Sequence, residues 1–79
     1  MEPKIKVYGT RICTDTLRAT QFLEERRVPY MWFDVDYDPE ALRLIKEVNN
    51  GKRTTPTIFF EDGSTLFEPT NEELAQKLD

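Results

Sequence analysis

The only cysteine of this chain, Cys13, stands where an apolar segment ends and an amphipathic segment begins. This change of pattern predicts a strand followed by a helix, with the thiol at the start of the helix. The first N–H groups of a helix have no intrahelical partner, and the helix dipole is positive there. Both effects favour a thiolate and can lower a thiol pKa from about 8.5 to roughly 3.5–7.5. The position indicates a nucleophile; the alternative is a small buried hydrophobic residue, the commoner role of a lone cysteine.

The composition excludes several other kinds of chemistry. The 79 residues contain one cysteine and no histidine. An intrachain disulfide is therefore impossible, and no metal site is expected, because zinc sites draw on several Cys or His ligands. Catalysis by a Ser–His or Cys–His pair is also excluded. Any nucleophile must be activated by its backbone position or by nearby cations.

Charge and hydropathy limit which kinds of partner and which cell compartment are expected. The net charge is −4, and the basic residues are scattered except for Arg26-Arg27 and Lys52-Arg53. We therefore expect no nucleic-acid partner. No apolar run approaches the ~20 residues of a membrane span, and residues 1–4 lack the apolar region of a secretory signal. The simplest expectation is a cytoplasmic protein with a reduced thiol and no membrane partner.

Hydrophobic patterning predicts the elements that position this thiol. Alternation or β-rich apolar composition predicts four strands, at residues 4–8, 30–35, 57–60 and 65–67. The periodicity of amphipathic helices is found in three segments, at residues 14–27, 39–48 and 71–78. The strand at 30–35 (YMWFDV) is apolar and aromatic throughout, which predicts burial on both faces.

Caps and turns support these elements and suggest the topology. Asp38 is a candidate N-cap with Pro39 at the first helical position, residues 49–51 are a helix stop, and Thr70 caps the last helix. A helix between the first two strands predicts that they are parallel, and Asp62-Gly63 predicts an antiparallel hairpin. The result is an α/β fold, β-α-β-α-β-β-α, with a four-stranded mixed sheet flanked by helices.

A cysteine after the first strand, the run Thr54–Phe60 (TTPTIFF), a hairpin and a capped last helix follow one another here. In this combination the chain resembles the glutaredoxins of the thioredoxin-like superfamily, over residues 4–78. It is most similar to short bacterial, mycoredoxin-like members, which share the Asp-Gly-Ser hairpin. The resemblance implies a thioredoxin-like fold in a single domain over residues 1–79.

The resemblance also implies how the thiol meets its substrate. It implies that Pro56 follows a cis peptide bond opposite Cys13 and that the backbone of Thr55 pairs with an extended substrate. Thr54 is assigned to the same substrate-binding set. Thr14 joins this set either as a hydroxyl donor to the thiolate or as an ordinary helix-start residue, and the Thr16 hydroxyl has the same two readings.

A glutathione-like ligand has carboxylates that need partners. The resemblance assigns one carboxylate to the N-terminus of the last helix, at Thr70 and Asn71, where free N–H groups bind anions. It assigns another to a cation, for which Arg11, Lys52 and Arg53 are candidates, although a solvated loop is an equal reading of the last two. No resident cofactor is implied; the co-substrate is glutathione or another low-molecular-weight thiol, such as mycothiol or bacillithiol.

The redox motif of the family has two cysteines separated by two residues, and here Thr16 occupies the second position. We therefore predict a monothiol cycle on mixed disulfides between proteins and a small thiol. Asp15 would oppose thiolate formation if it faced the sulfur; we expect it to be a helix-start residue that points away, with Arg11 to offset its charge. Tyr8 is predicted to line the cleft, whereas the other strand aromatics are predicted to be mostly core.

Two other functions remain open on the sequence. A dimer could bind an iron–sulfur cluster through Cys13 of each chain and two small thiols. Alternatively, the chain is a non-catalytic binding module that keeps the fold without the redox chemistry. The leading prediction is a monomeric, monothiol thiol–disulfide oxidoreductase of the glutaredoxin type.

Overall fold

The computed structural model describes residues 3–78 and contains the seven predicted elements in the predicted order. They are β1 (Ile5–Gly9), α1 (Thr14–Glu25), β2 (Tyr30–Asp34), α2 (Pro39–Val48), β3 (Thr57–Phe59), β4 (Thr65–Phe67) and α3 (Asn71–Leu78). No helix within the described residues is long and apolar enough to cross a membrane.

The four strands form one mixed sheet in the order β2-β1-β3-β4. Strand β1 is parallel to β2 and antiparallel to β3, so Val7 pairs with Trp32 on one side and with Ile58 on the other. Strands β3 and β4 form the predicted antiparallel hairpin.

Strand β2 corrects one prediction. All five of its residues are partly exposed, so its predicted burial on both faces is wrong. The physical reason is its place at the edge of the sheet, where β1 is its only strand neighbour. Its aromatic side chains pack against the core from the side and keep part of their surface in solvent.

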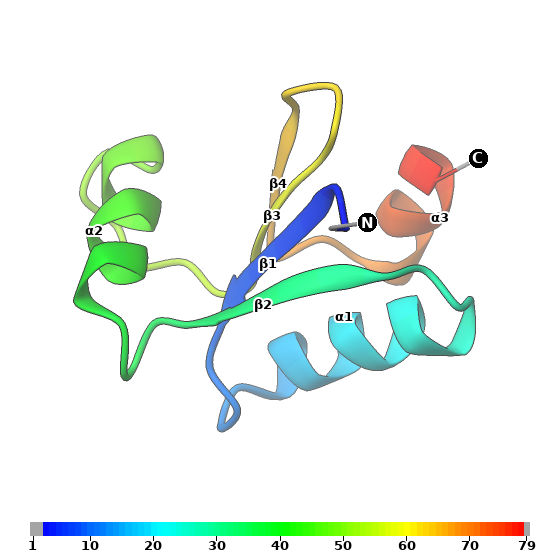
Figure 1. Ribbon diagram of the computed structural model, residues 1–79, viewed down its shortest axis with the longest axis horizontal. Coiled ribbons are helices and arrows are strands. Elements are labelled where there is room, and N and C mark those ends of the chain that lie inside the picture. Colours follow the sequence, from blue (N-terminus) through cyan, green and yellow to red (C-terminus); the bar gives the residue numbers. More distant parts are fainter. Residues whose placement is uncertain (1–2, 79) are drawn as a thin grey trace.

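The helices cover both faces of the sheet and create two core clusters. Figure 1 shows α2 on one face and α1 with α3 on the other. Because side chains alternate along a strand, Val7 of β1 packs with Leu23 and Leu74 on the α1 and α3 side. The next residue, Tyr8, packs with Ile45 on the α2 side.

Helix α1 ends two residues before its predicted end. Arg27 adopts the left-handed conformation (φ 57°). Its N–H donates to Glu24 O (3.0 Å), and the N–H of Val28 donates to Leu23 O (2.9 Å). These two bonds form a Schellman motif, in which arginine takes the position usually held by glycine.

The N-terminal caps of the other two helices lie where they were predicted. Asp38 accepts hydrogen bonds from the N–H groups of Glu40 and Ala41, with Pro39 in the first turn of α2. Before α3, Thr70 and Glu73 form a capping box: Thr70 N–H donates to Glu73 Oε1 (2.8 Å), and Glu73 N–H donates to Thr70 Oγ1 (3.1 Å).

Candidate thiol site

Cys13 is the N-cap residue of α1 and is partly exposed. Its backbone is extended (φ −92°, ψ 122°), its N–H donates to Thr10 O (3.2 Å), and its carbonyl accepts from Leu17 N–H (3.0 Å). The backbone is thus fixed on both sides of the thiol. Thr14, the first residue of the helix, is exposed.

The sulfur lies against the segment that precedes β3. The Thr55-Pro56 peptide bond is cis, as the resemblance implied. The thiol donates to Thr55 O at 3.7 Å, and the next residue, Pro56, is fully buried just before β3. Thr54 is tied into the same segment, because its hydroxyl accepts from the Asn49 amide and its carbonyl from the Thr57 hydroxyl (2.7 Å). The fold therefore brings Cys13 and Thr55 together.

The surroundings of Cys13 favour its thiolate. Partial burial raises the pKa, but hydrogen bonding from the backbone and hydroxyl of Thr16, from Thr55 and from the backbone of Asp15 lowers it below its ordinary value. The neutral thiol makes no cap hydrogen bond with these helical N–H groups. They therefore become partners of the sulfur when it loses its proton.

Thr16, in the first turn of α1, is packed tightly against the end of β1. Its side chain is fully buried, and a Cβ added at Gly9 would lie 2.5 Å from Thr16 Cγ2 and 2.9 Å from its Oγ1. Only glycine fits at position 9 without a shift. Among the described residues, the Thr16 hydroxyl has no hydrogen-bond partner while the thiol is neutral, which leaves it available to the thiolate.

Arg18 is the functional candidate that the sequence analysis missed. Its guanidinium lies 3.7 Å from the Asp15 carboxylate and donates to Asn71 Oδ1 (2.8 Å) and to Pro69 O (2.7 Å). Arg18, and not Arg11, is therefore the cation beside Asp15. The i, i+3 spacing of Asp15 and Arg18 on a predicted helix was the signal that could have found it.

The predicted carboxylate site at the start of α3 is already engaged by the chain itself. The N–H of Thr70 donates to the Glu73 carboxylate. The side-chain oxygen of Asn71 accepts from Arg18. Both residues lie at the exposed helix terminus where the resemblance assigned them. The Thr70 N–H would have to exchange partners before it contacted a ligand carboxylate, whereas the Asn71 oxygen is an acceptor and would not bind one.

The three predicted cations have different surroundings. Arg11 extends toward β2, where its guanidinium lies over the Trp32 ring, 4.9 Å from the centroid. Arg53 forms an ion pair with Asp36, which follows β2 in the chain. Lys52 is exposed in the loop before the cis peptide bond. Arg11 thus contacts β2, Arg53 is paired with Asp36, and Lys52 is exposed to solvent.

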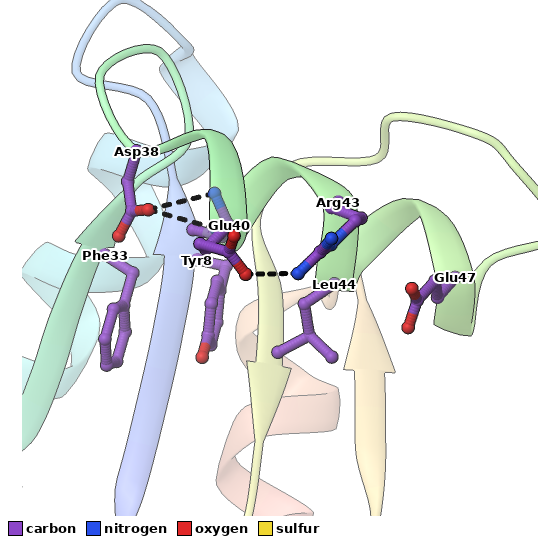
Figure 2. Close-up of a pocket in the computed structure, with 8 residues that line it drawn as sticks. Tyr8, Phe33, Asp38, Glu40, Arg43, Leu44 and Glu47 are labelled. Atoms are coloured by element: carbon purple, nitrogen blue, oxygen red, sulfur yellow. Dashed lines mark hydrogen bonds and ion pairs between the residues drawn. The ribbon is translucent and has the colours of Figure 1, made fainter.

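Tyr8 belongs to the packing beneath α2. Its ring stacks on Phe33 with centroids 4.5 Å apart and meets Phe59 edge-on at 5.2 Å. Figure 2 shows Tyr8 and Phe33 side by side in a pocket of about 300 Å³ under the helix. Burial and the nearby Asp38 carboxylate raise the pKa of Tyr8. Its ring thus lies in the α2 layer and not in the thiol site, contrary to the prediction.

The arrangement supplies a nucleophilic sulfur with hydrogen-bond donors around it and a free approach from solvent. Across residues 3–78, no group of three or more Cys, His, Asp or Glu side chains is placed to hold a metal ion. The chemistry available at Cys13 is attack on an electrophilic sulfur, with the leaving group protonated by solvent.

Comparisons with known proteins find chains of similar sequence. The glutaredoxin family model matches residues 5–64. A Mycobacterium tuberculosis protein classed as a glutaredoxin is 36% identical over 94% of this chain and 88% of its own length. Mycoredoxin 1 of Corynebacterium glutamicum is 31% identical over 95% of this chain and 92% of its own.

Solved structures of similar proteins superpose on this fold. A variant of the thioredoxin-like protein BC3987 is 32% identical and superposes with a TM-score of 0.81, covering 96% of this chain and 100% of that chain. A glutaredoxin from Archaeoglobus fulgidus, 20% identical, superposes with a TM-score of 0.77 over 96% of this chain and 86% of its own.

Proposed function

The chain belongs to the glutaredoxin family, and from this membership we propose that it reduces mixed disulfides between proteins and a low-molecular-weight thiol through Cys13 alone. The family supports a role of the thiol–disulfide oxidoreductase type. The observation that carries the proposal is the lowered pKa of a partly exposed Cys13 whose sulfur lies against Thr55 O.

The first step transfers the small thiol to the protein. The Cys13 thiolate attacks the small-thiol sulfur of a protein–S–S–R disulfide, so that the Cys13–S–S–R bond forms as the protein sulfur leaves. The leaving thiolate takes a proton from solvent. The donors around Cys13 favour its thiolate before the attack and again when Cys13 becomes the leaving group.

The second step follows from the residue at position 16. Because the chain has no second cysteine, no intramolecular thiol can release the adduct. A second small-thiol molecule attacks the R sulfur, which forms R–S–S–R and returns Cys13 as the thiolate. The sum is protein–S–S–R plus R–SH giving protein–SH plus R–S–S–R. This cycle needs a reducing compartment, and we include in the proposal a cytoplasmic monomer with no resident cofactor.

The test uses a cysteine peptide in a mixed disulfide with 2-mercaptoethanol, and in parallel with glutathione, with the matching free thiol as reductant. We expect the protein to speed release of the peptide thiol and Cys13→Ser to abolish this effect. Ile12→Ser is the matched control, since Ile12 is the next residue and 87% exposed. Thr16→Cys is expected to form an internal disulfide and change the range of substrates.

Equal rates for the wild-type protein and Cys13→Ser, on both peptides, would contradict the proposal. That result would favour a binding module that keeps the fold without the chemistry.

A further inference from the structure

Arg53 is the basic residue closest in sequence to the cis-proline segment, and the Asp36 carboxylate holds its guanidinium. Arg53 precedes Thr55 by two residues and is ion-paired with Asp36, whose side chain is 29% exposed against 43% for Arg53. Hydrogen bonds from Arg53 and from the Thr10 hydroxyl lower the pKa of Asp36. Because Thr10 O accepts the Cys13 N–H, this ion pair adjoins the loop that carries the thiol.

At the start of α3, donors are also held by groups of the chain itself. Two N–H groups of Arg18 donate to Asn71 Oδ1 and Pro69 O, and the Thr70 N–H donates to the Glu73 carboxylate. Pro69 is fully buried, so its carbonyl would lose its partner if Arg18 turned to a ligand. Arg18 and the Thr70 N–H, two of the donors that could bind a ligand carboxylate, thus already have partners within the chain.

The two remaining predicted cations, Arg11 and Lys52, add little attraction for a ligand carboxylate. Arg11 lies over the Trp32 ring, and Lys52 is exposed, where water and salt screen its charge. The chain as a whole carries a net charge of −4. A small thiol with several carboxylates therefore meets a site where Arg53 and Arg18 already have partners within the chain, on a protein of like charge.

From these contacts we infer that the thiol site discriminates against small thiols that carry carboxylates and accepts neutral or cationic ones, with Asp36 as a specificity-determining residue. Asp36 acts by holding the Arg53 guanidinium. A ligand carboxylate can bind this guanidinium only if it displaces the Asp36 carboxylate, which is part of the same chain and stays beside it. The inference rests on the proposed function, since it concerns which disulfides Cys13 attacks.

The experiment compares three symmetrical disulfides of different charge: glutathione disulfide (anionic), bis(2-hydroxyethyl) disulfide (neutral) and cystamine (cationic). In each reaction the Cys13–S–S–R bond forms and one R–S⁻ leaves, so the rate is followed by mass spectrometry of the adduct. Each rate is divided by that of N-acetylcysteine amide, an uncharged thiol, to remove differences between leaving groups. We expect the normalised rates to rise from glutathione disulfide to cystamine, by about tenfold at low salt, and to converge as salt is added.

Variants then assign the effect to Asp36. Asp36→Asn frees Arg53 and is expected to raise the normalised rate with glutathione disulfide about fivefold. Adding Arg53→Gln to Asp36→Asn should remove that gain. The matched control is Asp62→Asn, because Asp62 also forms an ion pair, with Lys77, but belongs to the hairpin turn after β3.

Different results would contradict the inference and the proposed function. A normalised preference for glutathione disulfide in the wild-type protein, or no change in Asp36→Asn, would overturn the inference and leave the proposed function standing. If Asp36→Asn does not fold, Arg53→Gln alone decides the role of the ion pair: because Asp36 already holds Arg53, we expect this change to leave the normalised rate with glutathione disulfide unchanged, and a fall in that rate would overturn the inference. A folded protein whose Cys13 reacts with none of the three disulfides would overturn the proposed function together with the inference.

Discussion

The sulfur of Cys13 lies among hydrogen-bond donors of the backbone and of two threonines, in a chain without histidine to act as a base. The sequence predicted this placement, because a strand-to-helix change is a local pattern. It left open whether the hydroxyls of Thr14 and Thr16 donate to the thiolate, and the structure favours Thr16. Thr16 approaches it because Gly9 leaves room for the threonine side chain at the end of β1, a contact made across two elements.

The Thr16 hydroxyl can be tested by removing it alone. We expect Thr16→Val to raise the pKa of Cys13 and so to slow its alkylation at neutral pH by about threefold to tenfold. The same change removes a buried hydroxyl that lacks a partner beside the neutral thiol. Below the Cys13 pKa, where the sulfur is protonated, the variant should therefore be more stable by about 1 kcal/mol. Iodoacetamide kinetics across pH and urea unfolding measure the two effects.

Thr20→Val is the control for this prediction. The Thr20 hydroxyl donates to Thr16 O (3.0 Å) and lies one turn further along α1, so its loss should leave the alkylation profile unchanged. A profile for Thr16→Val identical to that of the wild type would show that the hydroxyl plays no part in stabilising the thiolate.

At the scale of elements, Arg18 joins the second turn of α1 to the start of α3. It also lies beside the Asp15 carboxylate, two residues from the thiol. We expect Arg18→Met to leave Asp15 unneutralised and to lower the alkylation rate of Cys13 at neutral pH about threefold. Adding Asp15→Asn should restore the rate without restoring the bonds to α3. A rate in Arg18→Met that the second substitution does not restore would mean that Arg18 acts by positioning α3.

The C-terminus of α1 offers a prediction about stability. Arg27 is exposed and left-handed, a conformation that costs less for glycine than for residues with a Cβ. Arg27→Gly should therefore raise the free energy of unfolding by about 0.5–1 kcal/mol, as measured by urea denaturation. Arg27→Ala keeps the Cβ and should remain close to the wild type. A gain in both variants would mean that loss of the charge, and not the backbone, is responsible.

For the molecule as a whole, local signals predicted the order and type of the elements. Asp38 and Thr70 cap their helices through groups two or three residues away, so a short stretch of sequence contains the whole signal. The position of β2 at the sheet edge depends on which strands pair with β1. An apolar, aromatic strand such as β2 could occupy the centre or the edge of a sheet, so its composition does not predict which. The ion pair of Arg53 and Asp36 links residues 17 positions apart, and no local pattern predicts it.

The two core clusters share one sheet, and this predicts that they unfold together. Ile45, a residue of α2 with 0% exposure, lies in the cluster on the α2 side of the sheet. Ile45→Val should destabilise the protein by about 1 kcal/mol. Trp32 packs against the cluster on the α1 and α3 side, so its fluorescence monitors the other face. Because β1 contributes Val7 to one cluster and Tyr8 to the other, we expect urea transitions followed by Trp32 fluorescence and by far-UV circular dichroism to shift equally.

Val48→Ala is the control in the same helix, since Val48 is 42% exposed and its truncation should cost no more than about 0.5 kcal/mol. A fluorescence transition that stays in place while the dichroism transition of Ile45→Val moves would mean that α2 unfolds separately. In that case the thiol site could remain folded without α2, since Cys13, Thr16 and Arg18 all belong to α1 or its cap. Equal shifts would instead make the reactivity of Cys13 depend on the packing of both faces of the sheet.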